Sequence, residues 1–301
     1  MPYPSLPTSP TPDFLPSGWG RPKVADLGLK AGWWSQARTA LRWWMGAPWR
    51  GELQRVIAGD PAWQRLVTQQ AACLRPLIRC YIDRRYTVWQ RQRLGTEDFR
   101  MAGRSFTPEH KLRLAEGQSC PLLDLGEGFT VCLALNDLHP EEGLWALSLR
   151  NADQDRVFQL SFGFCPGGSL LVGSVQGGKR SDSFQPDAAI RAVTKLCHGL
   201  RPQHVIVHVL MALARRWQCR DVRFVDPRHQ AKSRWHRPPR HIRFDYARLF
   251  AELGMGQLSG GHWRAPAELP RRDLSDVDSR KRAQYRRRHD MLDGFSAALR
   301  C

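Results

Sequence analysis

The chain has 301 residues, of which 42% are hydrophobic, and this is enough for one large domain with a buried core. Its 46 lysine and arginine residues outnumber its 28 acidic residues, and the net charge of +18 favours polyanionic partners: nucleic acid, anionic lipid or phosphorylated small molecules. The longest nearly apolar run, residues 205–214, is too short to span a bilayer, so the composition excludes a transmembrane protein.

The first residues and the cysteines both indicate a soluble protein of the cytoplasm. Residues 1–22 are rich in proline and small polar residues, which predicts a disordered tail, and they lack the basic and apolar parts of a secretion signal. The eight cysteines form no C-x-x-C pair and lie in apolar contexts. We therefore expect free buried thiols in a reducing compartment and no bound metal.

Residues 23–116 are expected to form a helical N-terminal region. Trp34, Leu41 and Trp44 recur at helical steps, with Arg38 and Arg42 on the other side. Such a Trp- and Arg-rich helix can lie on a membrane surface, but the pattern favours packing of the tryptophans against the domain. Two further helix starts are predicted where a capping side chain precedes proline, at residues 60–61 and 107–108.

Residues 117–301 are expected to form an α+β core domain. Apolar residues alternate or run continuously at 129–135, 144–149, 158–164 and 170–175, which predicts an antiparallel meander of about four strands. Turn-forming residues separate these runs. The remaining elements are predicted as a helix between Asp187 and Gly199, a buried helix from Arg201–Pro202 to Trp217, a strand at 222–226, a helix at 244–253, a strand at 262–269 and a basic helix at 275–299.

A glycine-rich basic loop follows the last strand of the meander. It consists of Gln176, Gly177, Gly178, Lys179 and Arg180. A strand, a loop with bare backbone amides and a helix start together make a plausible anion cradle. The alternative is a tight turn with solvated charges, which the loop taken alone favours.

Two stretches resemble the signature of the VirK/YbjX family of bacterial proteins. The first combines residues 173–177 (GSVQG) with residues 194–202 (TKLCHGLRP), and the second is residues 279–288 (SRKRAQYRRR). The resemblance covers about residues 99–292. It implies a link to virulence, envelope stress and survival of antimicrobial peptides, and it implies no particular reaction or substrate.

The order of the predicted elements also resembles the acetyltransferase (GNAT) superfamily. There, a backbone-amide loop after the fourth strand holds the pyrophosphate of acyl-coenzyme A. The resemblance implies an acyltransferase-like enzyme with an acyl-coenzyme A donor at residues 176–180. The loop departs from the superfamily pattern because Lys179 and Ser181 stand where glycine is expected. The alternative is a non-enzymatic basic module that binds nucleic acid or anionic membrane surfaces.

Lys195, His198 and Arg201 are candidate ligands of the same anion. Lys195 and His198 are one helical turn apart, so both can face a phosphate or form a proton relay. The alternative for His198 is an interaction with the helix dipole. Arg201 opens an apolar helix, so we expect it to be held inside the fold, paired with Asp226 or with a ligand phosphate.

Asp226 and His229 are the candidate catalytic pair, together with His198. Asp226 ends a buried strand and His229 follows three residues later, as a base and its orienting acid can do. The alternative is a turn aspartate that caps Arg228. His204 and His208 have the spacing of a zinc site, but Val205 replaces the glutamate of H-E-x-x-H, so no metal is expected.

The last predicted helix contains a run of cations around Tyr285. A charge run of this kind is usually a solvated helix face, and an arginine-rich coding bias explains it without a ligand. Tyr285 set among arginines can instead contact a phosphate or stack on a base. Both interpretations stay open at the level of sequence.

Overall fold

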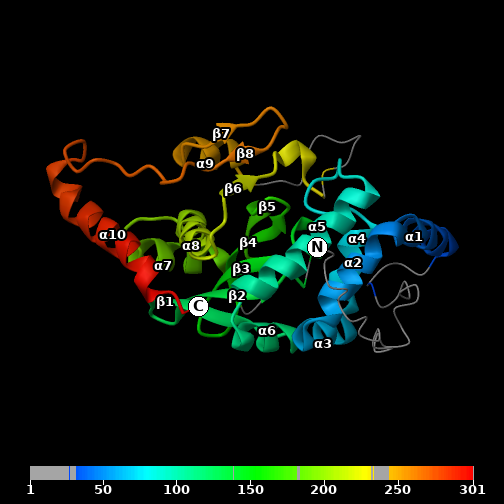
Figure 1. The fold of residues 1–301 in the computed structure, drawn as a ribbon. Coiled ribbons are helices and arrows are strands. Elements are labelled where there is room, and N and C mark those ends of the chain that lie inside the picture. The colour runs from blue at the N-terminus through cyan, green and yellow to red at the C-terminus, as the bar shows by residue number, and fades with distance from the viewer. Residues whose placement is uncertain are drawn as a thin grey trace, which may run out of the picture.

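The computed structural model describes residue 27 and residues 32–137, 139–181, 184–231, 233 and 244–300. Within these residues the fold is α+β, as predicted, with one eight-stranded sheet between two groups of helices (Figure 1). The N-terminal helices lie on one side of the sheet, and the helices that follow it lie on the other. The predicted disordered tail, residues 1–22, falls outside the described residues.

The part of the chain before the sheet is helical. The predicted helix starts are confirmed: the carboxylate of Asp60 accepts a hydrogen bond from Ala62 N at 3.0 Å, and Thr107 Oγ1 accepts one from His110 N at 3.2 Å. The helices are α1 (Trp33–Met45), α2 (Ala47–Ala58), α3 (Pro61–Gln69), η1 (Ala71–Leu74), α4 (Arg75–Ile78), α5 (Val88–Ser105) and α6 (Pro108–Ala115).

The helix α1 buries a different face from the one expected. Its tryptophan stripe, including Trp34 and Trp44, is exposed, while Thr39 and Trp43 on the opposite face are buried. The guanidinium of Arg50 lies over the Trp43 ring, 3.7 Å from its centroid, and donates to the Trp43 carbonyl at 2.6 Å. The prediction that the stripe packs on the domain is therefore wrong, because the contacts of Trp43 decide which side of α1 faces the core.

The sheet begins with an antiparallel meander of five strands, one more than predicted. The first strand was missed because Pro121, Asp124 and Gly126 interrupt its apolar pattern. β6 then pairs in parallel with β5, and the predicted last strand is reduced to the two residues of β8. The strands, in the spatial order β1-β2-β3-β4-β5-β6-β8-β7, are β1 (Cys120–Gly126), β2 (Phe129–Leu135), β3 (Trp145–Arg150), β4 (Arg156–Cys165), β5 (Ser169–Gly177), β6 (Asp221–Phe224), β7 (Gly256–Gln257) and β8 (Trp263–Arg264).

The apolar helix α8 (Pro202–Arg216) packs across β3 to β6, which explains why nearly all its sides are buried. Before it, α7 (Pro186–Leu196) starts after Gln185, so Asp187 is not its cap but lies in its first turn. The other elements are η2 (Pro140–Glu142), η3 (Pro227–His229), α9 (Tyr246–Glu252) and the basic α10 (Ser279–Ala298). In the described ranges, no helix combines the length and apolarity needed to cross a membrane.

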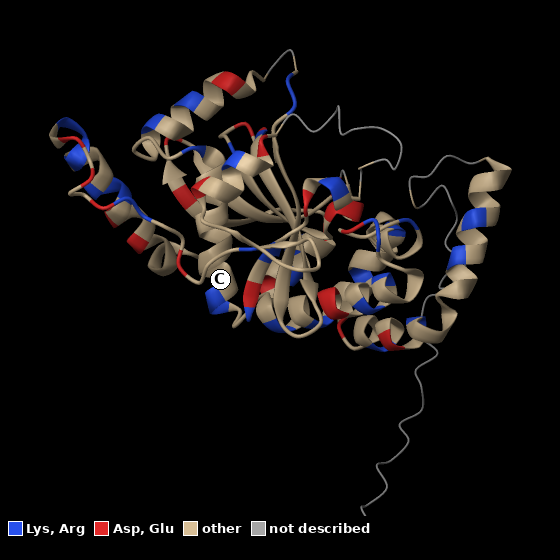
Figure 2. Cartoon of the chain, turned by 90° about the horizontal axis from the view of Figure 1, so that it is seen from above, with Lys and Arg blue, Asp and Glu red and all other residues tan. Residues whose placement is uncertain are grey.

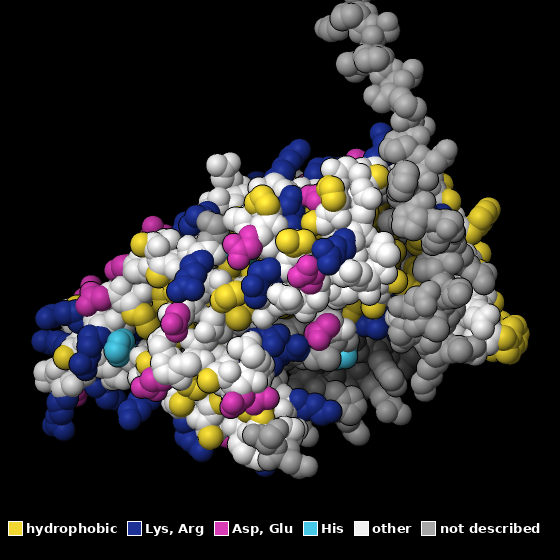
Figure 3. Space-filling view, turned by 90° about the horizontal axis from the view of Figure 1, so that it is seen from below, with side chains coloured by type: hydrophobic (Ala, Val, Ile, Leu, Met, Phe, Trp, Pro, Cys, Tyr) yellow, Lys and Arg dark blue, Asp and Glu magenta, His cyan; other side chains and the backbone are white. Residues whose placement is uncertain are grey.

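The helices α1 and α10 lie at opposite ends of the molecule (Figure 2). Lysine and arginine side chains gather at the α10 end (Figure 3). The last helix and the loop before it carry eight lysine and arginine residues at positions 271–288. This is the region where a cavity lies between α8, α9 and α10.

Candidate anion-binding site

A cavity of about 670 Å³ lies at the start of α8, enclosed by the end of α9, the loop at residues 270–272 and one face of α10. Its volume is in the range of small-molecule sites in proteins. Among the residues that line it in the described part of the chain, one carboxylate, Glu252, faces a set of five arginines: Arg201, Arg248, Arg271, Arg272 and Arg288.

The cavity is built where the two family-like motifs meet. Arg288 in the second motif donates from Nε and Nη2 to the backbone carbonyl of His198 in the first, at 3.1 and 2.8 Å. The next residue, Gly199, has a φ of 80°, and a Cβ there would lie 2.8 Å from the Arg288 guanidinium. Glycine therefore suits the left-handed turn, and it leaves room for the Arg288 side chain beside the backbone.

Tyr285 lies beside this contact on α10 and lines the cavity. The Arg288 guanidinium stands over its ring, 4.2 Å from the centroid. Burial alone would raise the pKa of Tyr285, but the positive charges of Arg288 and Arg272 outweigh it and lower the pKa. The lowered pKa indicates a cationic environment, which stabilises the ionised phenolate or a bound anion.

Arg201 lies at the N-cap of α8 and lines the cavity, but it is exposed. The expectation that it is buried is wrong, because the buried side of α8 starts at Pro202 and Val205 and the backbone turns outward before them. Its expected partner, Asp226, bonds instead to Arg228. To the residues that the structure describes, Arg201 makes no side-chain hydrogen bond or ion pair, so its planar donor fork is available to a ligand.

A short polar network closes the α9 side of the cavity. The carboxylate of Glu252 accepts from Arg248 Nε at 2.8 Å and lies 3.0 Å from His204 Nε2. The hydrogen bond from Arg248 is the main reason that the pKa of Glu252 is lowered. Since this contact engages His204 Nε2, the histidine pair at spacing i, i+4 forms part of the wall of the cavity.

The two histidines of α8 are held neutral by their surroundings. Burial lowers the pKa of His204 despite the opposing effect of Glu252. Burial, assisted by electrostatic interaction with His204 and by the positive charge of Arg271, lowers the pKa of His208 to about 4. At neutral pH the positive charge of the cavity therefore comes from arginines, whose charge does not depend on pH in the physiological range.

The glycine loop does not line this cavity. Gln176 and Gly177 are still part of β5, and the amide of Gly178 donates to Val157 O at 2.9 Å. A Cβ on Gly178 would lie 1.9 Å from the Arg156 carbonyl oxygen, so a close backbone approach explains this glycine. Lys179 and Arg180 are exposed, and Arg180 Nη2 lies 3.0 Å from the Asp187 carboxylate.

The edge of β5 beyond its pairing with β6 is covered by a tyrosine. Tyr246 Oη accepts a hydrogen bond from Val175 N at 2.8 Å and donates one to Val175 O at 3.1 Å. The parallel pairing of β5 with β6 extends from Ser169 to Val172, so Val175 lies past its end. Its backbone groups are satisfied inside the fold rather than offered to a ligand.

Lys195 and His198 do not share a helix face. The helix α7 ends at Leu196, and His198 follows it in a left-handed conformation with a φ of 53°. The spacing argument assumed a helix through both residues, so it does not hold. Lys195 is exposed, neither side chain lines the cavity, and His198 contributes its carbonyl as the acceptor for Arg288.

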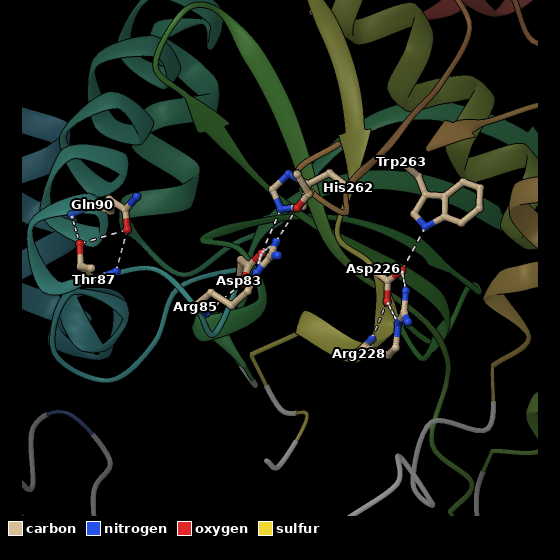
Figure 4. Close-up of polar contacts among 9 residues, drawn as sticks. Asp83, Arg85, Thr87, Gln90, Asp226, Arg228, His262 and Trp263 are labelled. Carbon is tan, nitrogen blue, oxygen red and sulfur yellow. Dashed lines mark hydrogen bonds and ion pairs between the residues drawn. The ribbon is translucent and has the colours of Figure 1, made fainter. Parts of the chain in front are cut away.

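Asp226 adopts the alternative interpretation, a turn aspartate that caps Arg228 (Figure 4). The Asp226 carboxylate accepts from Arg228 N and Arg228 Nε, both at 2.9 Å, and from Trp263 Nε1 at 3.4 Å. Burial opposes its ionisation, but these hydrogen bonds outweigh burial and lower the pKa of Asp226. His229 meets Asp226 through its backbone amide, at 2.7 Å from the Asp226 carbonyl, so the two side chains do not form the expected acid–base pair.

A second buried aspartate in the same view was not identified from the sequence. Asp83 is fully buried, accepts from Arg85 Nη2 at 2.6 Å and lies 3.0 Å from His262 Nε2 (Figure 4). Burial would raise its pKa, but the hydrogen bonds from His262 and Arg85 lower it to about 2. The signal in the sequence is the Asp-x-Arg spacing that Asp83 and Asp226 share, and both sites join distant segments of the fold.

Comparison with known proteins places the chain among bacterial relatives. A family model described as "Protein of unknown function (DUF535)" matches residues 30–300. A protein of Haemophilus influenzae, titled "Uncharacterized protein", is 30% identical over 86% of this chain and 88% of its own length. "Uncharacterized protein YbjX" of Escherichia coli is 28% identical over 64% of this chain and 57% of its own length.

A further relative is titled "Membrane protein LapB", from Mannheimia haemolytica. It is 26% identical over 58% of this chain and 76% of its own length. No solved structure matches the chain. The predicted acetyltransferase-like arrangement is therefore not supported by a solved structure, and the fold is described as α+β.

Proposed function

The chain belongs to the DUF535 family, within which the match to YbjX confirms the predicted VirK/YbjX resemblance, and on this premise we propose that it binds a phosphate-bearing anion in the cavity between Arg201 and Arg288. The VirK/YbjX resemblance, together with a relative titled a membrane protein, LapB, supports a role associated with the bacterial envelope and virulence. The proposed ligand class is a small molecule that carries phosphate groups.

The observation that carries the proposal is the convergence of two distant motifs on one cationic cavity. Packing of α10 against the turn before α8 accounts for Arg288 and Gly199. It does not account for Arg201, whose exposed guanidinium makes no hydrogen bond to the described residues. Guanidinium groups bind phosphate through two parallel hydrogen bonds. A group of arginines opposed by one carboxylate, in a cavity of this size, suits a ligand with more than one negative charge.

The acyl-coenzyme A hypothesis belongs to the same ligand class, because coenzyme A carries phosphates. The cavity supports it better than the glycine loop does, since the Gly178 amide already bonds to β4 and Tyr246 covers the edge of β5. We therefore include coenzyme A among the probes rather than propose a transfer reaction. Binding of any of these probes indicates phosphate recognition. The order of their affinities indicates which groups besides phosphate the cavity recognises.

The test is thermal unfolding with phosphate, pyrophosphate and coenzyme A. A ligand that binds the native state raises the melting temperature by mass action. We expect pyrophosphate to raise it for the wild type and for the control Arg287→Gln, whose arginine is exposed on α10 and does not line the cavity. Arg201→Gln should lose most of this rise. An equal rise of the melting temperature in Arg201→Gln would refute anion binding in the cavity. A loss of this rise in Lys179→Gln alone would assign the anion to the glycine loop instead.

A further inference from the structure

The helix α1 presents an apolar face to solvent at the end of the molecule opposite α10. Trp33, Trp34 and Trp44 are 66%, 63% and 74% exposed, and Leu41 and Met45 beside them are also exposed. At 100° per residue these five side chains occupy an arc of about 120° on one side of the helix. Large aromatic side chains rarely gather on a surface that serves only to face water.

This face is outward because α1 is attached to the domain by its other side. Thr39 and Trp43 are buried, and Arg42 Nη1 donates to the Ile78 carbonyl at 3.4 Å. Trp49 at the start of α2 is 43% exposed and extends the aromatic surface past the end of α1. The aromatic face is therefore held in place by a folded support rather than being one side of a detached helix.

The charges around the face have one sign. The helix α1 has no acidic residue, and at 100° per residue Arg38 lies about 20° beyond the edge of the apolar arc. Over α1 and α2 together, four arginines stand against the single carboxylate of Glu52. A helix with tryptophan and leucine on one side and arginine beside them has the composition of a segment that lies in the plane of an anionic membrane surface.

We infer that α1 is a membrane-docking element, which places its tryptophans in the headgroup layer of an anionic bilayer. Indole rings prefer this layer because they are apolar with one polar N–H, and arginine side chains extend from it to lipid phosphates. The exposed face is aromatic with a basic residue at its edge, which suits contact with an anionic bilayer surface. A second copy of the same face would bring the arginines of both copies together, so self-association is disfavoured.

The test is flotation of the full chain with vesicles of phosphatidylcholine, with or without phosphatidylglycerol. We expect the wild type to float with the anionic vesicles. The triple variant Trp33→Ser, Trp34→Ser, Trp44→Ser should bind at least about tenfold more weakly, because it loses the inserted aromatic surface. Arg38→Gln should weaken binding about fivefold and reduce its dependence on salt. The control is Trp89→Ser, which removes an exposed tryptophan, with 42% of its surface accessible, from the start of α5.

Two results would overturn the inference: equal flotation of the triple variant and the wild type, or no flotation of the wild type. A third result would also contradict it: the triple variant still binds vesicles, but its mass in solution falls from that of an oligomer to that of a monomer. The aromatic face would then be a contact between two copies of the chain. Because all three tryptophans are exposed, the triple variant should keep the wild-type melting temperature, so lost binding is not lost folding. Arg201→Gln should float like the wild type, which separates this surface from the proposed cavity.

Discussion

The guanidinium of Arg288 holds the backbone carbonyl of His198 through two donors, at 3.1 and 2.8 Å, across 90 residues of chain. His198 and Gly199 are both left-handed, with φ of 53° and 80°, and they form the turn that separates α7 from α8. The last helix thus satisfies a carbonyl at the end of α7 and positions the start of α8. Through this contact the shape of the cavity depends on α10.

Replacement of Arg288 by glutamine should lower the free energy of unfolding by about 1–3 kcal/mol, because the His198 carbonyl loses charged donors in a half-buried site. Urea unfolding measures this change. The control is Arg287→Gln, at an exposed neighbouring position, which should alter stability by less than about 0.5 kcal/mol. Equal effects of the two substitutions would show that the contact contributes nothing.

Arg201→Lys should leave the stability unchanged within about 0.5 kcal/mol, because the side chain is exposed and has no partner among the described residues. It should weaken pyrophosphate binding about tenfold, since lysine keeps the charge but not the two parallel donors. Isothermal titration gives the affinity. If lysine binds as tightly as arginine, the site recognises charge alone and the bidentate geometry is not used.

Gly178→Ala should destabilise the protein by about 2–4 kcal/mol, because the new Cβ would lie 1.9 Å from the Arg156 carbonyl oxygen, which belongs to the backbone. Gly177→Ala is the matched control, since the nearest atom to its Cβ is a Phe158 ring carbon at 3.8 Å. Its stability should stay within about 1 kcal/mol of the wild type. Similar stability of the two variants would show that the loop adjusts and that Gly178 is not required by packing.

Acidification should destabilise the protein through His208. Its folded pKa, about 4, lies below the unfolded value near 6.5, so the unfolded chain binds the extra proton between these values. The stability is therefore full above pH 6.5 and falls by up to about 3 kcal/mol as the pH decreases toward 4. Unfolding measured across this range should show a shallower dependence for His208→Gln. An unchanged slope in that variant would assign the effect to other groups.

The local sequence pattern was sufficient to predict whether most elements are helices or strands. It was not sufficient to predict which side of each element is buried. Alternation in β4 and the apolar run of α8 predicted both correctly, since each depends on nearby residues. The periodicity of α1 indicated a helix, yet the side that is buried depends on Trp43 and Arg50, a tertiary contact. Likewise, Gly178 suggested a phosphate loop, because the Arg156 carbonyl that explains it lies on another strand.

The cavity could be predicted only in part for the same reason. Arg201 and Tyr285 belong to recognisable motifs, and both line it. The i, i+4 pair of Arg248 and Glu252 is visible in the sequence, but nothing local connects it with α8. Arg271 and Arg272 lie in a loop without regular pattern, so their place beside α10 follows from the docking of that helix.

The docking of α10 also has a consequence for synthesis of the protein. The strands and α8 precede α10 in the chain and can form during translation, before Arg288 leaves the ribosome. The turn at Gly199 then lacks its guanidinium partner, and the cavity lacks a wall. Under the proposed function, a polypeptide stalled or cut before α10 would keep its sheet but lack the wall of the cavity that recognises the anion.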